Sequence, residues 1–459
     1  MNSSDTAGTL AARMRDTPYQ AYSYSYPHKT AYRPLAQPAS LAALWEQEDR
    51  TALFAYIHVP FCAMRCGFCN LFAMANPRPE MVDRYVAQVL AQMRVLDGVL
   101  GARRFARFAI GGGTPTYLAP GQLQALLEGA RDILGIDLHA TPAGIEASPE
   151  TVTPERLDVC RRLGIDRVSL GIQSFSAGET RALARPQQND VVRGAIAHIR
   201  AAGFPTLNLD LIYGIAGQTV DSLLASIDSA LAFAPEELYL YPLYVRAHTG
   251  LGKVAARRGA TAFDPIVLAQ AGDDRLALYA AARDHLQGRG YEQVSMRMFR
   301  APHAPGQDGP SYCCQNDGMV GLGAGARSYT RRVHYATDYA VGRAGTQDII
   351  EDFLALDAAG FAQARHGFVL GREEQRRRYA IQSLLTEPGL DLAAYRQRFG
   401  NDCLDDLPQL LELDQLGLLE PAAGMLRLNA RGYAYADTIG PWLASDAVRA
   451  LMAAGAPAC

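Results

Sequence analysis

Short apolar runs alternate with amphipathic stretches along the middle of this chain. The apolar runs cover residues 54–59, 105–110, 143–147, 167–172, 206–212 and 238–244. The stretches between them repeat apolar side chains at helical spacing, at 80–97, 121–134, 154–163, 190–202 and 219–232. Strands alternating with helices predict parallel βα units, because each helix carries the chain back to start the next strand. Six such units predict an α/β fold, a partial (β/α)6 barrel of the TIM type rather than the full eight-stranded form.

The N-terminal residues 1–50 do not follow this pattern and are expected to form a tyrosine-rich arm. Residues 18–34 hold five tyrosines, flanking prolines and the pair His28-Lys29. One interpretation is an arm that packs across the barrel, with its tyrosines covering apolar surface. The other is a lid that presents hydroxyl groups and His28 to a substrate. Packing is favoured, because aromatic side chains bury large apolar areas.

The regular alternation of strands and helices ends near residue 250. Residues 266–288 are expected to be a helix and 291–299 a strand, followed by a loop at 300–317. From about residue 350 the chain is mainly helical, with a short strand near 425. We therefore expect a barrel with an extension at 51–345 and a mainly helical, winged-helix-like C-terminal domain at 346–459.

Composition excludes several kinds of partner. The chain has 459 residues, a net charge of −3, 49% hydrophobic and 20% charged residues, as in an ordinary globular enzyme. This charge would attract neither nucleic acid nor an anionic membrane, and no apolar run is long enough to span a bilayer. No secretory signal is expected at the N-terminus. Of the eight cysteines, three lie in one loop, Cys313 and Cys314 are adjacent, and Cys160, Cys403 and Cys459 are scattered. This distribution suits a reducing, cytoplasmic setting rather than a disulfide framework.

The three clustered cysteines are candidate metal ligands. Cys62, Cys66 and Cys69 are spaced C-x3-C-x2-C directly after the first apolar run. Three thiolates can hold three corners of a [4Fe–4S] cube and leave one iron open to an external ligand. A structural zinc site requires four ligands, commonly as two C-x2-C pairs, and only one such pair, Cys66 and Cys69, is present. The spacing therefore favours a cluster with an open iron.

Distinctive residues also follow the other strands. They are the turn Gly111-Gly112-Gly113-Thr114-Pro115, then Glu146, Gln173-Ser174, Asp210 and Tyr244. The C-terminal ends of barrel strands form one face, and that face carries the chemistry. Each residue alone could be a satisfied core group, and the glycines alone a tight turn; they are not a phosphate loop, since no lysine follows. As a set on one rim, they indicate ligand contact.

These motifs together resemble a known enzyme family. In order they are YIHVPFC-x3-C-x-FC, GGGTPTYL, SLGIQSF, NLDLIYG-x2-GQT and GLGAGARS. The resemblance runs from about residue 50 to 330 and continues more weakly through the C-terminal region. The motifs are similar to the radical S-adenosylmethionine (SAM) enzymes and, more narrowly, to the oxygen-independent coproporphyrinogen III oxidase family. Its relatives include haem-chaperone-like paralogues and class C radical SAM methyltransferases. The resemblance implies that SAM binds the open iron and is cleaved by reduction to methionine and a 5′-deoxyadenosyl radical.

The same resemblance assigns site residues and implies two SAM molecules in one barrel. The contacts expected for the cluster-bound SAM are Tyr56, Gly112, Glu146 and Arg327. Those expected for the second SAM are Phe68, Gly113, Thr114, Gln173, Arg185, Asp210 and Tyr244. We further expect an external electron donor of the flavodoxin or ferredoxin kind, a small-molecule substrate and a monomeric protein.

Three departures from the family pattern suggest a separate subfamily. Leu71 stands where the oxidases have a further cysteine. Pro186-Gln187 follows the arginine that comes after GIQSF, and this pair matches the pattern of neither relative. The segment from Tyr312 to Asp317 replaces the His- and Trp-containing element of the chaperone-like paralogues. Cys313 and Cys314 within it are expected to be buried thiols rather than substrate contacts. Three functions stay open: hydrogen abstraction from a small organic substrate, as in oxidative decarboxylation of coproporphyrinogen III; methyl transfer or cyclopropane formation; and haem binding without radical chemistry.

Overall fold

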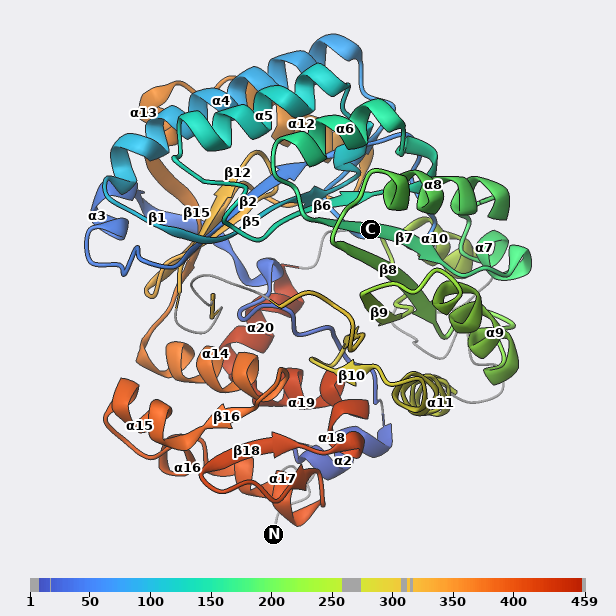
Figure 1. Cartoon of the computed structure of the whole chain (residues 1–459). Coiled ribbons are helices and arrows are strands. Elements are labelled where there is room, and N and C mark those ends of the chain that lie inside the picture. The colour runs from blue at the N-terminus through green and yellow to red at the C-terminus, as the bar shows by residue number, and fades with distance from the viewer. Residues whose placement is uncertain (1–7, 17, 258–273, 307–311, 314–316, 456–459) are drawn as a thin grey trace.

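The computed structural model describes residues 8–16, 18–257, 274–306, 312–313 and 317–455 (Figure 1). Six parallel strands lie side by side in chain order. They are β2 (Leu53–Val59), β5 (Phe105–Gly112), β6 (Ala143–Ala147), β7 (Arg167–Gln173), β8 (Thr206–Tyr213) and β9 (Glu237–Pro242). Each predicted strand is found within about two residues of its expected limits. The predicted partial barrel is confirmed.

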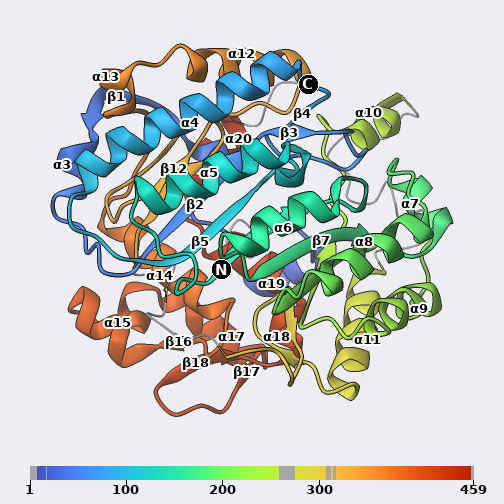
Figure 2. The same cartoon turned by 45° about the horizontal axis from the view of Figure 1, so that its top comes forward.

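Helices cover the outer face of these strands (Figures 1 and 2). They are α4 (Pro79–Leu100), α5 (Pro120–Asp132), α6 (Pro154–Arg162), α8 (Asn189–Ala201) and α9 (Val220–Leu231). Pro79, Pro120 and Pro154 each start a helix at a position where the missing N–H would have had no intrahelical partner. Buried leucine, valine and methionine side chains of the helices pack on the outward residues of the strands to form the main core.

Alternate residues of the strands divide between this core and the barrel interior. Leu209 and Leu211 are fully buried towards the helices, whereas Asp210 between them is partly exposed. In β6, likewise, Ile145 and Ala147 are buried, whereas Glu146 between them is exposed. Successive side chains of a strand point to opposite faces, so these carboxylates point inward. The interior of the barrel is therefore polar and open, unlike the filled centre of a complete TIM barrel.

Further strands extend the sheet at both ends, giving thirteen among the described residues. Beyond β2 come β12 (Met319–Leu322), which is parallel to it, and then β13 (Arg327–Tyr329), β14 (Val333–Ala336), β15 (Gln363–Val369) and β1 (Arg33–Ser40). Beyond β9 come β11 (Met298–Arg300) and β10 (Glu292–Gln293), both in antiparallel pairs. The arm strand β1 pairs with β15, so two segments far apart in the sequence share one sheet edge.

The expected strand at 291–299 is wrong in one respect. Its residues form the two short strands β10 and β11 with a turn between them, because the Ser295 hydroxyl accepts hydrogen bonds from the N–H groups of Arg297 and Met298. The helix expected at 266–288 corresponds to α11 (Arg275–Gly288), and its first eight residues lie outside the described residues.

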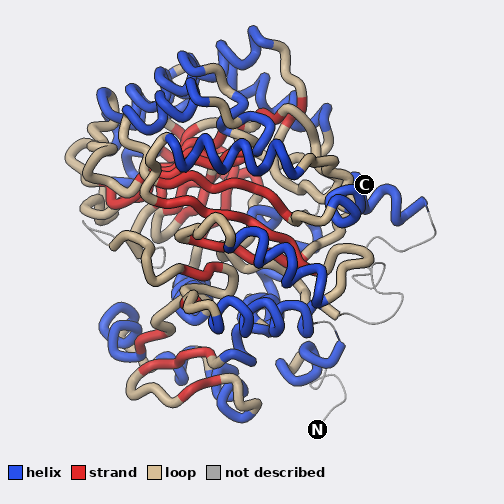
Figure 3. The backbone as a smooth tube through the Cα atoms, turned by 45° about the vertical axis from the view of Figure 1, so that its right-hand side comes forward, coloured by secondary structure: helices blue, strands red, loops and turns tan. Residues whose placement is uncertain are grey.

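A second, smaller unit lies beneath the barrel (Figure 3). It has its own core, which includes Tyr379, Leu384, Tyr395, Leu413 and Trp442. This unit contains a three-stranded antiparallel sheet and several helices. The strands, in sheet order, are β16 (Leu390–Asp391), β18 (Met425–Leu428) and β17 (Leu419–Glu420). The helices are α14 (Arg372–Leu384), α15 (Leu392–Phe399), α16 (Cys403–Asp406), α17 (Leu411–Gln415), α18 (Ala430–Ala434), α19 (Ala436–Leu443) and α20 (Asp446–Ala454). Helices with a small antiparallel sheet are the winged-helix-like arrangement expected.

The remaining helices lie in the connections. They are α2 (Leu10–Asp16), α3 (Leu41–Trp45), α7 (Ala177–Ala182), α10 (Gly250–Arg257), α12 (Arg343–Leu354) and α13 (Ala358–Phe361). Within the described part of the chain, no helix combines the length and the apolar character that crossing a membrane requires.

Candidate active site

The cysteine loop starts directly after β2 and is fixed at both ends. Two short parallel strands, β3 (Phe61–Cys62) and β4 (Met74–Ala75), pair across its base. In its middle, the N–H of Gly67 donates to the carbonyl of Leu183 over 3.1 Å. A Cβ on Gly113 would lie 2.9 Å from the Cys62 sulfur, so only glycine allows the turn after β5 to approach the loop this closely. The two sequence motifs thus form one structural unit.

The three thiols suit a cluster better than a single ion. Cys66 is buried, and Cys62 and Cys69 are partly buried. Burial raises the pKa of Cys62 to about 12 and also raises the pKa of Cys69, so the thiolates need a positive partner. Among the described residues, no three Cys, His, Asp or Glu side chains converge as ligands of one metal ion would. The thiolates of a [4Fe–4S] cube each bind a different iron, and three cysteines on one loop fit that requirement.

Two of these sulfurs accept hydrogen bonds from the predicted second-SAM residues. The guanidinium of Arg185 donates to the Cys66 sulfur over 3.1 Å and to the carbonyl of Gly171 over 2.8 Å. The Thr114 hydroxyl donates to the Cys62 sulfur over 3.5 Å. Hydrogen bonds to cluster sulfurs help to set the reduction potential. Arg185 and Thr114 therefore contact the cysteine loop directly.

Gly112 and Glu146 form the next part of the rim. The Gly112 N–H donates to the Glu146 carboxylate over 2.9 Å. Gly112 has a φ of 116°, and a Cβ there would lie 2.6 Å from the ring of His58, so this position also requires glycine. Burial raises the pKa of Glu146 to about 7, yet its side chain is exposed to solvent. The carboxylate is surrounded by protein and still reached by water, because Glu146 faces a water-accessible interior deep within the protein.

A second carboxylate lies in the same interior. Asn208 donates a hydrogen bond to Asp210 over 2.8 Å, and burial raises the pKa of Asp210 to about 6. The charge of Asp210 is one reason why the pKa of Glu146 is raised. Two acidic groups that repel each other favour a cationic ligand, because a positive charge between them stabilises both in the ionised form. SAM carries such charge on its sulfonium and its amine.

Gln173 ends β7 in a backbone conformation that few side chains adopt. Its φ is 71°, and the pairing of β7 with β8 shifts register between Gly171 and Gln173. Left-handed residues of this kind cost of order 1–3 kcal/mol and concentrate at functional sites. Gln173 therefore ends β7 beside β8, the strand that carries Asp210.

Tyr56, Phe68, Tyr244 and Arg327 are the remaining predicted residues. Tyr56 lies on the inner face of β2, where its pKa is raised by burial and then by the charge of Glu146. Phe68 packs with an apolar cluster that includes Leu183, Ile212 and Leu243. Tyr244 follows β9, with the Arg246 guanidinium 4.7 Å from its ring centre. Arg327 lies on β13, where it donates to the Ser25 hydroxyl and lies 4.7 Å from the ring centre of Tyr24.

The structure adds residues that the sequence interpretation missed. His58, on the same face of β2 as Tyr56, lies 3.4 Å from the Tyr56 hydroxyl and 2.9 Å from the Phe72 carbonyl. Burial lowers the pKa of His58 to about 4, so it is a neutral group here. Side chains two residues apart in a strand lie on the same face, so the position of Tyr56 could have identified His58 as a residue of the interior. Tyr22 and Tyr24 of the arm enter the barrel interior, where the Tyr22 ring lies 6.1 Å from that of Tyr241. The sequence predicted that the tyrosines of this arm pack across the barrel, but not which of them reach its interior.

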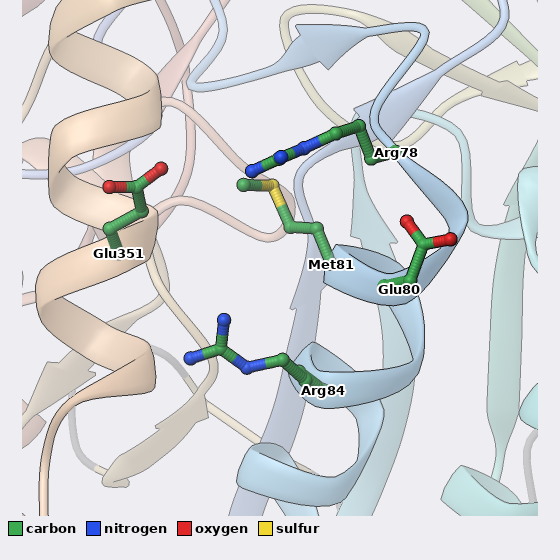
Figure 4. Close-up of a pocket in the computed structure, with 5 residues that line it drawn as sticks. All are labelled: Arg78, Glu80, Met81, Arg84 and Glu351. Carbon is green, nitrogen blue, oxygen red and sulfur yellow. The ribbon is translucent and has the colours of Figure 1, made fainter.

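A separate cavity lies between α4 and α12 (Figure 4). Its volume is about 330 Å³, and it is lined by Arg78, Glu80, Met81, Arg84 and Glu351. None of the predicted site residues lines it, so it does not belong to the rim.

Comparison with known proteins places this site in a family. Residues 56–230 match the model of the radical SAM superfamily, and residues 370–435 match that of the HemN C-terminal domain. The chain is 30% identical over 400 residues to the heme chaperone HemW of Mycobacterium tuberculosis, covering 84% of this chain and 93% of that one. The chain belongs to the radical SAM superfamily, in its HemN/HemW-type family.

The members of this HemN/HemW-type family include enzymes and chaperones. The chain is 28% identical over 399 residues to the oxygen-independent coproporphyrinogen III oxidase of Pseudomonas aeruginosa, covering 83% of this chain and 81% of that one. The fold is similar to that of coproporphyrinogen III oxidase (HemN) from Escherichia coli, with a TM-score of 0.73, 22% identity and coverage of 92% and 96%. Membership of the radical SAM superfamily implies a [4Fe–4S] cluster and SAM.

Proposed function

We propose that this protein uses SAM, cleaved reductively at a [4Fe–4S] cluster, to abstract hydrogen from a small organic substrate in a reaction of the coproporphyrinogen oxidase type. The observation that supports it most strongly is the junction of the cysteine loop and the glycine turn, where Gly113 approaches Cys62 too closely for any other residue. The junction lies beside an interior lined by Glu146 and Asp210. A cluster and a cationic ligand would therefore meet in one place.

The residues of the chain have distinct roles in this proposal. Cys62, Cys66 and Cys69 would hold the cluster. When bound, the cluster and SAM would supply an electron and a 5′-deoxyadenosyl radical. Gly112 lets the turn after β5 pack against the ring of His58, and the carboxylate of Glu146 accepts a hydrogen bond from the Gly112 N–H. Phe68, Gln173, Arg185, Asp210 and Tyr244 would contact a second SAM.

The arm would limit access of water to the substrate. Tyr22 packs against Tyr241, and Tyr24 packs against Arg327, so aromatic rings line the interior near Glu146. Excluding water protects a reactive radical from side reactions. An external reductant of the flavodoxin or ferredoxin kind would supply the electron, and a reducing cytoplasm is the setting that we propose.

Haem binding is the second candidate. It is favoured by the 30% identity to the heme chaperone HemW of Mycobacterium tuberculosis, a value slightly above that for the oxidase of Pseudomonas aeruginosa. Against it stands the segment that begins at Tyr312, which lacks the histidine and tryptophan of the chaperone-like paralogues.

Product analysis tests the proposal. The protein, reconstituted without oxygen, is mixed with SAM, dithionite and coproporphyrinogen III, and the products are followed by mass spectrometry. Formation of 5′-deoxyadenosine with decarboxylated porphyrinogen supports the proposal. S-adenosylhomocysteine beside 5′-deoxyadenosine would indicate methyl transfer instead. Stoichiometric haem binding without SAM cleavage would indicate the chaperone function.

A further inference from the structure

The middle of the cysteine loop is held between α7 and α10. The Gly67 N–H donates to the carbonyl of Leu183, which directly follows α7, and the Gly67 carbonyl accepts a hydrogen bond from the N–H of Leu251 in α10 over 2.8 Å. Phe68 and Leu251 pack against one apolar cluster, which includes Leu183. The two helices lie on the same side of the barrel (Figures 1 and 2). The cysteine loop, α7 and α10 therefore form one continuous part of the protein.

The exposed charges of this part are positive. Arg181 of α7 and Lys253 and Arg257 of α10 are exposed, and within the described residues none of their side chains makes an ion pair or a hydrogen bond. Residues 60–79, which include the cysteine loop, and residues 238–257, which include α10, contain no Asp or Glu. The chain as a whole has a net charge of −3, so this part differs in sign from the average of the protein.

The acidic residue of α7 does not offset these charges at the surface. Glu179 is buried, and its carboxylate accepts hydrogen bonds from the hydroxyls of Ser174 and Ser222, each over 2.6 Å. Its charge is therefore directed to groups inside the protein, and the outer side of α7 presents Arg181.

Exposed apolar side chains accompany the positive charges. Leu71 of the cysteine loop and Val254 of α10 are each 44% exposed. Along the chain, each lies four residues from a glycine of the contact between the loop and α10, Gly67 and Gly250. Apolar side chains among exposed charges of one sign are typical of a small surface that binds another protein.

The candidate cluster ligands lie next to this surface. Cys62 and Cys69 are partly buried, and the residue after each of them, Ala63 or Asn70, is exposed. Electron transfer slows steeply with distance, so an external reductant has to approach the cluster from a surface close to it. On its inner side the loop borders an interior with carboxylates, whereas on its outer side the exposed charges are positive.

We propose that the outer side of the cysteine loop, α7 and α10 is a docking surface for an acidic electron-transfer protein. Arg181, Lys253 and Arg257 attract the acidic face of the partner, and Leu71 and Val254 make the apolar contact. This inference rests on the proposed function, which requires an external reductant, and adds where that reductant binds. Electron-transfer complexes bury small interfaces, and opposite charges accelerate their association. A nucleic acid would be bound by a longer run of positive charges.

Binding of flavodoxin, an acidic flavoprotein, to the reconstituted protein tests the docking surface. Calorimetric titration compares the wild type with K253E/R257E and with R104E, at low and at high salt. Arg104 is an exposed arginine that precedes β5, at the opposite end of the strands from the cysteine loop. We expect K253E/R257E to weaken binding at least about tenfold and R104E to leave it unchanged, because only the former reverses charges that face the partner. Wild-type affinity should fall as salt rises.

Formation of 5′-deoxyadenosine with two reductants provides a second readout. Reduced flavodoxin has to dock, whereas reduced methyl viologen is a small cation that does not use the docking surface. K253E/R257E should slow the reaction driven by flavodoxin about tenfold and leave the reaction driven by methyl viologen at the wild-type rate. A loss with both reductants would instead mean that the cluster or SAM binding is damaged, and it would overturn the assignment of Lys253 and Arg257 to docking.

The outcomes separate this inference from the proposed function. If neither reductant yields 5′-deoxyadenosine with the wild type while flavodoxin binding depends on Lys253 and Arg257, the docking surface stands and the proposed function falls. Equal flavodoxin binding by the wild type and K253E/R257E would overturn the docking surface. So would a wild type that does not bind flavodoxin, or one that binds duplex DNA as tightly. If K253E/R257E fails to fold, the salt series on the wild type decides: an affinity that does not change with salt overturns the docking surface.

Discussion

The guanidinium of Arg185 donates a hydrogen bond to the sulfur of Cys66 across 3.1 Å. Because a hydrogen bond to a ligand sulfur stabilises the more negative, reduced cluster, its loss should make the potential more negative. We expect R185M to lower the potential on the order of 60 mV, the one-electron equivalent of about 1.4 kcal/mol. Redox titration followed by electron paramagnetic resonance measures this shift. R181M, at an exposed position on α7, is the control, and an equal potential in R185M and R181M would contradict the assigned role.

SAM binding should depend on pH through Glu146. Burial raises the pKa of its carboxyl to about 7, so the ionised form that attracts a cation is lost as pH falls through about 7. Affinity for SAM should therefore weaken below neutral pH. E146Q should bind SAM about tenfold more weakly at about pH 8 and with a flatter pH profile.

The same pKa shift predicts the effect of E146Q on folding. A carboxyl whose pKa is higher in the folded state binds more protons there, so its contribution to stability falls as pH rises from its unfolded value of about 4.3 to about 7. Without SAM, E146Q should thus be more stable than the wild type at about pH 8, and the difference should vanish at about pH 4. A difference in melting temperature that does not change with pH would contradict this prediction, and E150Q at an exposed position is the control.

Substitutions at Gln173 distinguish the effect of its strained backbone on stability from the effect of its side chain on function. With a φ of 71°, this position suits glycine, whereas a β-branched side chain is strongly disfavoured there. Q173G should change the free energy of unfolding by less than about 1 kcal/mol, and Q173V should destabilise by more than about 1 kcal/mol. If the Gln173 side chain contacts SAM, Q173G should nevertheless lose SAM cleavage. A stable Q173G protein with full activity would exclude Gln173 from the site.

The buried ion pair between Arg297 and Asp437 connects the barrel to the C-terminal unit. Both side chains are at most 3% exposed. Because D437A leaves the charge of Arg297 buried and unpaired, it should destabilise by about 3–5 kcal/mol, and the double variant R297M/D437L should recover much of the loss. Denaturant unfolding measures both effects. D402A, which removes the exposed partner of Arg396, should cost at most about 1 kcal/mol. Similar losses in D437A and D402A would contradict this account.

Much of the barrel could be predicted from sequence because local pattern and tertiary packing agree there. The parallel strands are short segments in which apolar residues prevail, and the five helices between them begin near a proline or a polar cap. The candidate site followed from the chemistry of single motifs: three cysteines in one loop, glycines where backbones touch, and carboxylates at strand ends. The structure brings the loop, glycine and carboxylate motifs together; their contacts with SAM stay a prediction.

Other features depend on contacts that no local pattern records. Tyr24 lies beside Arg327, and β1 pairs with β15, across sequence separations of several hundred residues. The single strand expected at 291–299 is two strands because one serine hydroxyl closes a turn. Such groupings become visible only when the fold is known.

The most direct test of the central claim is SAM cleavage by a variant of one cysteine in the loop. Wild-type protein, C66A and C313A are reconstituted with iron and sulfide without oxygen, reduced with dithionite and assayed for 5′-deoxyadenosine. Cys313 lies outside the loop and serves as the matched control. We predict that C313A forms 5′-deoxyadenosine at the wild-type rate, whereas C66A forms less than about a hundredth as much, because the cluster loses one of its three protein ligands. Undiminished SAM cleavage by C66A would contradict the account.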